Sequence, residues 1–167
     1  VSGGVTLKTD VVSGAVGEAV KSSIKQNVSL IKSIPRNYFE KIEGEVMRSI
    51  QSGQGMKDLQ PAIEKLGETT KKRSALIARD QTSKATTAIN SARMKGLGIK
   101  QFEWLHTYGG KEPRELHKEK LNGQIFDLDN PPIIDERTGE RGLPGQLINC
   151  RCRMVPVISF QAEEIKS

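Results

Sequence analysis

The stretch TTKKRSALIARDQTSKATTAINSARMKGLGIKQFEWLH, residues 69–106, decides the fold class, because its hydrophobic period changes part-way along. From Thr69 to Met94 small and apolar residues recur at helical spacing, which predicts one long central helix. Two glycines then end the pattern. From residue 99 the period becomes two, with Phe102, Trp104 and His106 on one face, as is typical of a β-strand. The sequence therefore predicts an α+β protein.

Two further apolar stripes precede the long helix. The first is thin and flanked by polar residues, so it predicts a helix that docks on a partner; its members are Val16, Val20, Ile24 and Val28. The second predicts a helix that ends at the glycines 53 and 55, and its members are Phe39, Ile42, Val46 and Ile50. Asp58 then fits as the N-cap of a short helix with Pro61 in its first turn. We expect three to four helices in this half of the chain.

After residue 98, short elements alternate with loops. Pro113 is well placed to open a short helix through Leu121, and Asn122-Gly123 predicts a turn before a strand at residues 124–128. Residues 129–146 are expected to form a loop. The side chains of residues 151–160 alternate in character, which predicts that this segment forms the last strand. The sequence thus divides into a docking helix or extended arm (1–35), a helical part (36–97) and a small α+β unit around a short antiparallel sheet (98–167).

Composition narrows the functional classes. The 167 residues are 35% hydrophobic and only 4% aromatic, which predicts an elongated chain that folds partly against a partner. The net charge of +6 favours an acidic partner, whether nucleic acid, an acidic protein surface or an anionic membrane. No stretch approaches the ~20 apolar residues that span a bilayer. The first residues lack a signal-peptide pattern, so we expect a cytoplasmic origin.

The α+β unit holds both histidines and both cysteines of the chain: His106, His117, Cys150 and Cys152. Two nitrogens and two sulfurs are the donor set of a closed tetrahedral Zn²⁺ site, and a structural zinc would stabilise so small a unit. Residues i and i+2 share one face of a strand about 6.6–6.8 Å apart, where two thiolates can bind one metal. A disulfide there would lie near its limit of about 7 Å between Cα atoms. Free thiols with hydrogen-bonded histidines, a disulfide and a zinc site all remain open.

Catalytic signals are weaker. A Cys-His pair is available and Arg151 and Arg153 would lower a thiol pKa, but no glycine-rich turn that could stabilise an oxyanion lies directly beside the cysteines. The chain has no Walker loop, no HExxH and no GxSxG. We therefore expect no enzyme.

Several short motifs follow one another in a specific order and spacing: Ile77-Ala78-Arg79-Asp80-Gln81-Thr82, Phe102-Glu103-Trp104, His106-Thr107-Tyr108-Gly109-Gly110, Pro113-Arg114, His117, Leu121-Asn122-Gly123, Pro144-Gly145 and Ile148-Asn149-Cys150-Arg151-Cys152. Together they resemble the phage Mu F-like head-morphogenesis (minor capsid) family, and the resemblance covers about residues 36–158. Members differ around the position of His106, so the resemblance supports His117 and the cysteines as metal ligands more than His106.

The resemblance implies a low-copy virion protein without enzymatic activity, which binds the portal or the major capsid protein inside the head and contacts the packaged genome. Two other hypotheses stand beside it. One is a basic module that binds nucleic acid through Lys71, Lys72 and Arg73, with steep salt dependence. The other is a cysteine-dependent enzyme with a reactive thiol at Cys150 or Cys152.

Overall fold

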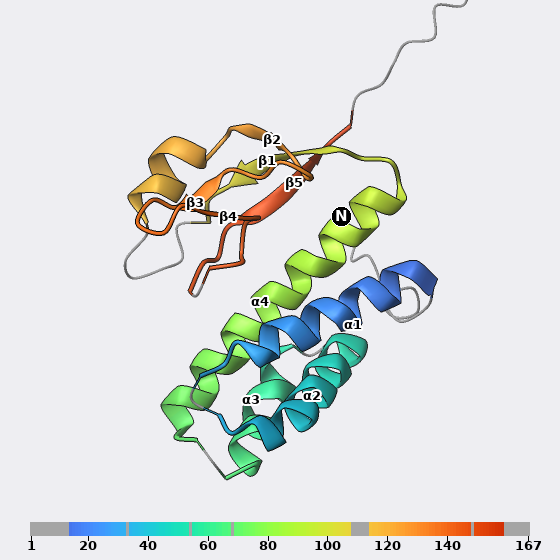
Figure 1. Cartoon of the computed structure of the whole chain (residues 1–167), viewed down its shortest axis with the longest axis vertical. Coiled ribbons are helices and arrows are strands. Elements are labelled where there is room, and N and C mark those ends of the chain that lie inside the picture. Colours follow the sequence, from blue (N-terminus) through green and yellow to red (C-terminus); the bar gives the residue numbers. More distant parts are fainter. Residues whose placement is uncertain are drawn as a thin grey trace, which may run out of the picture.

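The long helix forms the axis of the molecule (Figure 1). The structure is a computed structural model that describes residues 14–32, 34–53, 55–67, 69–107, 114–147 and 149–158. Helix α4 (Lys71–Gly96) has 26 residues and is therefore about 39 Å long. It begins at Thr70, whose side chain accepts a hydrogen bond from the backbone N–H of Arg73. The other α-helices pack around its first half, and the strands lie at its far end, which confirms the predicted α+β class.

Three α-helices and one short 3-10 turn (η1, Arg36–Tyr38) complete the helical end: α1 (Gly14–Ser29), α2 (Phe39–Ser52) and α3 (Met56–Lys65). Helix α2 ends where predicted, because Gly53 adopts a left-handed φ of 72°. The predicted N-cap of α3 was wrong. The helix follows Gly55, and Asp58 lies in its first turn, where the carboxylate accepts a hydrogen bond from Ser52 Oγ at 3.0 Å.

Helix α1 is part of the bundle. Its stripe residues Val20, Ile24 and Val28 are at most 3% exposed and share one apolar core with Ile42 of α2 and Leu59 of α3. The interpretation of α1 as a helix that presents its stripe to a partner is therefore wrong. The stripe looked thin because α1 needs only one narrow face to close the groove between α2 and α4.

The three-stranded sheet has the order β2-β1-β5 and is antiparallel throughout. Its strands are β1 (Gln101–Leu105), β2 (Ile125–Asp127) and β5 (Arg153–Val157). Phe102 and Trp104 are fully buried on the inner face, as the period of two predicted. The proposed helix start at Pro113 lies outside the described residues. The helix itself is a single wide π-helical turn, η2 (Leu116–Leu121).

Residues 129–146 are not simply a loop. They contain a hairpin of β3 (Ile133–Asp135) and β4 (Glu140–Arg141), which closes where Gly139 takes a left-handed φ of 71° and its N–H donates to the Asp135 carbonyl at 2.9 Å. Three- and two-residue strands between prolines and charges carry too little alternation to be predicted. The hairpin matters because Ile134, 1% exposed, completes a second core around Trp104, Leu121 and Leu128.

Helix α4 connects the two cores. Its Ile77, Ala78 and Ala85 belong to the helical core, whereas Met94 belongs to the core of the sheet. No helix in the described part of the chain is long and apolar enough to cross a membrane.

Candidate metal centre

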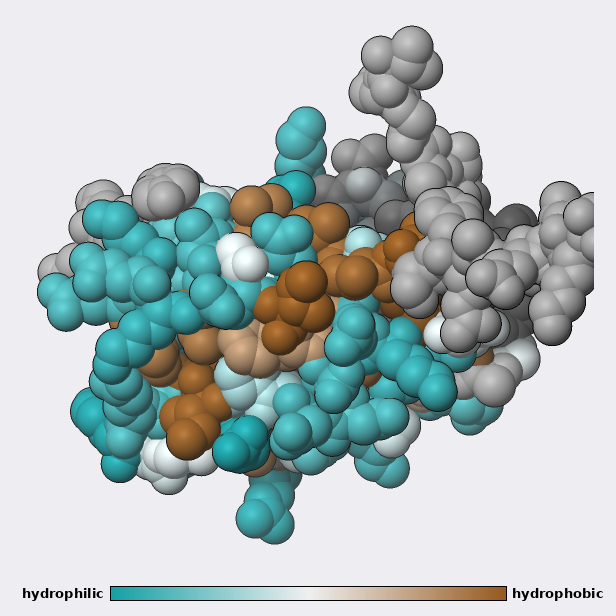
Figure 2. Space-filling model, turned by 90° about the horizontal axis from the view of Figure 1, so that it is seen from above, coloured by the Kyte–Doolittle hydropathy of each residue, from teal (hydrophilic) through white to brown (hydrophobic). Residues whose placement is uncertain are grey.

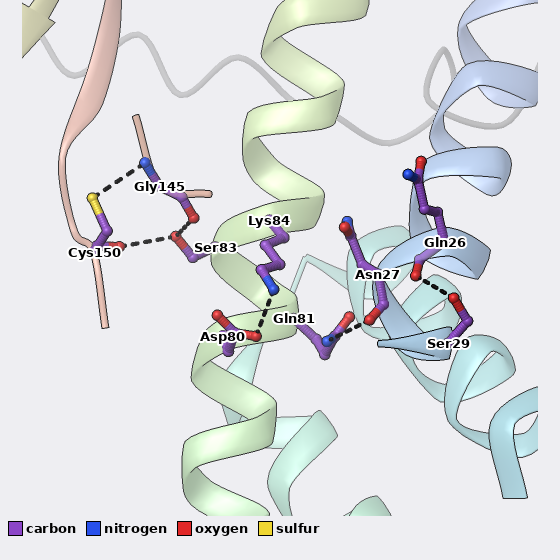
Figure 3. Close-up of polar contacts among 9 residues, drawn as sticks. All are labelled: Gln26, Asn27, Ser29, Asp80, Gln81, Ser83, Lys84, Gly145 and Cys150. Carbon is purple, nitrogen blue, oxygen red and sulfur yellow. Dashed lines mark hydrogen bonds and ion pairs between the residues drawn. The ribbon is translucent and has the colours of Figure 1, made fainter. Parts of the chain in front are cut away.

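Cys150 and Cys152 lie just before β5, on a segment that is fastened to α4. Ser83 of α4 donates hydrogen bonds to the carbonyls of Gly145 and Cys150, at 3.1 and 3.2 Å (Figure 3). Thr87, one turn further on, donates to the carbonyl of Pro144 at 2.7 Å. The approach leaves no room for a side chain at Gly145, where a Cβ would lie 2.7 Å from Thr87 Oγ1. The long helix therefore fixes the position of residues 144–145 and 150–152, which we call the cysteine segment.

His117 reaches the cysteines from the η2 turn. The hydrogen bond from the N–H of Asn122 to the carbonyl of His117 spans five residues and gives the turn its wide π-helical form. The imidazole is 2% exposed and packs edge-on against Trp104, with ring centroids 5.0 Å apart. Its Nε2 lies 2.9 Å from the carbonyl oxygen of Ile134. Because a carbonyl can only accept, Nε2 carries the proton and Nδ1 is left as a lone-pair donor.

That lone pair is directed at the sulfurs. His117 Nδ1 lies 3.5 Å from Cys150 Sγ and 3.8 Å from Cys152 Sγ. These three ligand atoms all lie within 4.8 Å of one another, and all three residues are buried. A histidine whose second ring nitrogen donates to a backbone carbonyl is the usual arrangement of a metal ligand. The cluster of His117, Cys150 and Cys152 could hold a metal ion.

His106, the fourth candidate, is close to the cluster but outside that tight group. Its Nδ1 lies 3.5 Å from Cys152 Sγ, and its backbone N–H donates to the Asn122 side chain at 3.0 Å. Burial lowers the pKa of its imidazole, with the Cys150 charge opposing the shift. A neutral imidazole is the form that binds metal. The structure thus brings all four residues together, and three of them form the compact group.

Hydrogen-bond donors surround both sulfurs. The backbone N–H groups of Gly145, at 3.4 Å, and of Cys152 donate to the Cys150 sulfur. The backbone N–H of Thr107 does the same for Cys152. The indole N–H of Trp104 lies close enough to the Cys152 sulfur to lower its pKa, and makes no other hydrogen bond to the described residues. Such donors stabilise sulfur in its thiolate form.

The two thiols differ in acidity. A hydrogen bond from Cys152 lowers the pKa of Cys150 to about 4; burial opposes this shift, and hydrogen bonds from the backbone N–H groups of Cys152 and Gly145 reinforce it. The same hydrogen bond raises the pKa of Cys152, and burial raises it further. Both cysteines are free and about 5–7% exposed, and the hydrogen bond between them favours the thiolate form at Cys150 over that at Cys152. A positive ion between them would displace the remaining proton, because thiolates are the form that ligates metals.

Comparison with known proteins assigns the family. The model of the family described as phage Mu protein F like protein matches residues 40–155, which is more than half of the chain. The chain belongs to the phage Mu F-like family. An uncharacterized protein of Haemophilus influenzae is 38% identical over 152 residues, which make up 91% of this chain and 32% of the relative. The chain thus spans about a third of that relative's length. No solved structure matches this chain.

The phage Mu F-like family is a family of phage head-morphogenesis proteins. All four candidate ligands lie within the matched segment, and so do the α4 residues that fasten the cysteine segment. Sequence reasoning missed the role of Ser83 and Thr87. Their signal is the spacing of four residues, which places two hydroxyls on one face of a helix otherwise rich in alanine.

Proposed function

We propose that this protein is a minor component of the phage head that binds the portal, or the adjacent inner wall formed by the major capsid protein, during head assembly in the host cytoplasm. It remains in the virion beside the packaged DNA. The family match over residues 40–155 carries this proposal. Two properties of the chain agree with it: the elongated form along α4 and the net charge of +6.

The face that we assign to the protein contact is the outer face of the sheet, because the stripe of α1 is used inside the bundle. Strand register aligns Ile125, Glu103 and Val155 in one row, with Leu105 next to them along β1. Ile125, Leu105 and Val155 are 54%, 42% and 38% exposed. Figure 2 views this end of the molecule from above and shows apolar surface gathered between hydrophilic flanks.

The test is native mass spectrometry of the chain mixed with its cognate portal ring, without DNA. The proposal expects a defined number of bound chains. It further expects Ile125→Asp/Val155→Asp to abolish binding. The control Lys21→Asp, on the exposed face of α1, should bind like the wild type. Deleting α1 would not be informative, because that helix contributes to the core. A ring that binds no wild-type chain would overturn the portal role.

We also propose that the cluster holds a structural Zn²⁺ through His117, Cys150 and Cys152, with His106 as the fourth ligand. With Zn–S bonds of about 2.3 Å and Zn–N bonds of about 2.0–2.1 Å, tetrahedral geometry requires about 3.6 Å between ligand nitrogen and sulfur. The nitrogen–sulfur distances of 3.5 and 3.8 Å at His117 and of 3.5 Å at His106 fit this requirement. Two sulfurs with two imidazoles favour zinc over the hard cations.

The ion would add a further link between three segments: the end of β1, the η2 turn and the start of β5. Thermal unfolding with and without a chelator, followed by the fluorescence of the single tryptophan, tests this role. We expect chelation to lower the midpoint for the wild type and to leave Cys150→Ser unchanged. A wild type whose midpoint does not respond to chelation would rule out the zinc staple without affecting the portal proposal.

A further inference from the structure

A groove beside the candidate metal centre has no acidic residue among the described residues that line it. It lies between α4 and the start of β5, has a volume of about 820 Å³, and is lined by three arginines: Arg79, Arg151 and Arg153. The other described residues of the lining are neutral, and none of them is aromatic. Three positive charges converge here from segments about 70 residues apart in the sequence, so the fold rather than a local charge run creates this surface.

Two of these arginines differ from two lysines of α4 that form ion pairs. Lys84 pairs with Asp80 at 3.1 Å, and Lys95 pairs with Asp129 at 3.3 Å. Arg79 and Arg153 take part in none of the ion pairs among the described residues. Their guanidinium groups are therefore available to an anion from outside the chain.

Backbone carbonyl oxygens near the groove already accept hydrogen bonds from side chains of its lining. Hydroxyls of the lining residues Ser83, Thr87 and Thr107 donate to backbone carbonyls of the cysteine segment, at 2.7–3.2 Å. These bonds occupy the carbonyl oxygens of Pro144, Gly145, Cys150 and Arg151, which would otherwise repel an anion. Asn90, exposed on α4, adds an amide donor to the lining. The result is a wall of positive charge and N–H donors in which these four carbonyl oxygens already accept hydrogen bonds.

The free edge of β5 does not favour a peptide strand as the occupant. Pro156 is opposite Phe102 in the register and has no N–H to offer an added strand. Proline on an edge strand is a common protection against strand addition. The groove therefore fits a ligand that needs charge and donors rather than a backbone ladder.

We infer that this groove binds the phosphodiester backbone of nucleic acid, without reading its sequence. This rests on the proposed position of the protein beside the packaged DNA. Arginine is the side chain best suited to phosphate, and amide groups add phosphate contacts that carry no sequence information. The described lining residues offer no aromatic ring on which a base could stack. The groove, rather than the Lys71-Lys72-Arg73 run, is then the nucleic-acid contact.

The test measures binding of the full chain to a fluorescent 30-base-pair duplex over a range of salt concentrations. Arg79→Gln/Arg153→Gln removes two positive charges from the groove, and Lys71→Gln/Lys72→Gln removes the same charge from the start of α4. Each phosphate contact contributes about 0.9 to the slope of log K against log salt. We expect the groove variant to lose about 1.8 of this slope and to bind about 60-fold more weakly at 0.1 M salt. The control should bind like the wild type, and the tryptophan emission of both variants should be unchanged.

Equal weakening of both variants would overturn the inference, because overall charge would then explain the binding. Equal affinity for poly-glutamate, or competition by inorganic phosphate at matched phosphate concentration, would overturn the assignment to a nucleic-acid chain. A wild type that does not bind the duplex overturns the groove but leaves portal binding by native mass spectrometry untouched. Conversely, DNA binding through the groove without portal binding would refute only the portal role.

Discussion

Gly145 offers a quantitative test of how α4 positions the cysteine segment. Its φ of +87° is left-handed, which costs an alanine about 1–2 kcal/mol. A Cβ would also lie 2.7 Å from Thr87 Oγ1 and 3.0 Å from Ser83 Oγ. Relieving that contact breaks the bond from Thr87 to the Pro144 carbonyl, and a buried acceptor without a partner costs about 1–3 kcal/mol. We therefore expect Gly145→Ala to lower the free energy of unfolding by about 2–5 kcal/mol.

Gly139→Ala is the matched control. Its φ of +71° imposes a similar backbone cost, but no heavy atom lies within 4 Å of the added Cβ. The entropy that alanine removes from the unfolded chain is common to both variants, so it cancels in the comparison. Urea unfolding at fixed metal concentration, followed by the fluorescence of Trp104 in the second core, gives both values. Gly145→Ala should be the less stable by about 1–3 kcal/mol. Equal stability of the two variants would refute the described contact between the segment and α4.

Three further predictions follow from buried or bonded side chains. Val20→Asp should unfold the helical bundle, because it places a charge at a fully buried site. The control Ala19→Asp, on the exposed face of α1, should retain the far-UV circular dichroism of the wild type. A stable Val20→Asp variant would restore the interpretation of α1 as a docking arm. Ile134→Ala should lower the free energy of unfolding in urea by about 2–5 kcal/mol. The control Ile133→Ala, at a side chain that is 40% exposed, should lower it by less than about 1 kcal/mol. Equal losses in the two variants would contradict the packing of the hairpin. The pKa of Asp135 should be below its ordinary value, because the N–H of Arg137 donates to its carboxylate. The resulting stabilisation is present above about pH 4 and is lost as the pH falls through the lowered pKa of the folded protein. An NMR titration that shows an ordinary pKa would contradict that bond.

Periodicity was enough to predict the long elements. Apolar stripes of three- and four-residue steps predicted α2 and α4, and the alternation of Phe102 and Trp104 predicted β1 and its buried face. The stripe of α1 was seen, but its partner was not, because periodicity gives the apolar face of a helix and not what covers it. The hairpin at Ile134 was missed because its two short strands are defined by tertiary packing rather than by a local pattern.

The candidate metal centre was predictable in its residue types but not in its geometry. His106, His117, Cys150 and Cys152 could be selected because they are the only histidines and cysteines of the chain. That His117 turns its Nδ1 toward the sulfurs depends on the carbonyl of Ile134, a contact across 17 residues that no spacing rule contains. The same holds for Ser83, whose bonds to the cysteine segment link residues more than 60 positions apart.

The zinc content of the purified full chain tests the central structural claim most directly. Native mass spectrometry in volatile buffer, after exposure to equimolar zinc, should show one ion per wild-type chain and none in Cys150→Ala/Cys152→Ala. His106→Ala should retain the ion with weaker affinity, because the compact group of three ligands remains. A wild-type chain that carries no zinc under these conditions would contradict the account and leave a hydrogen-bonded cluster of free thiols and imidazoles in its place.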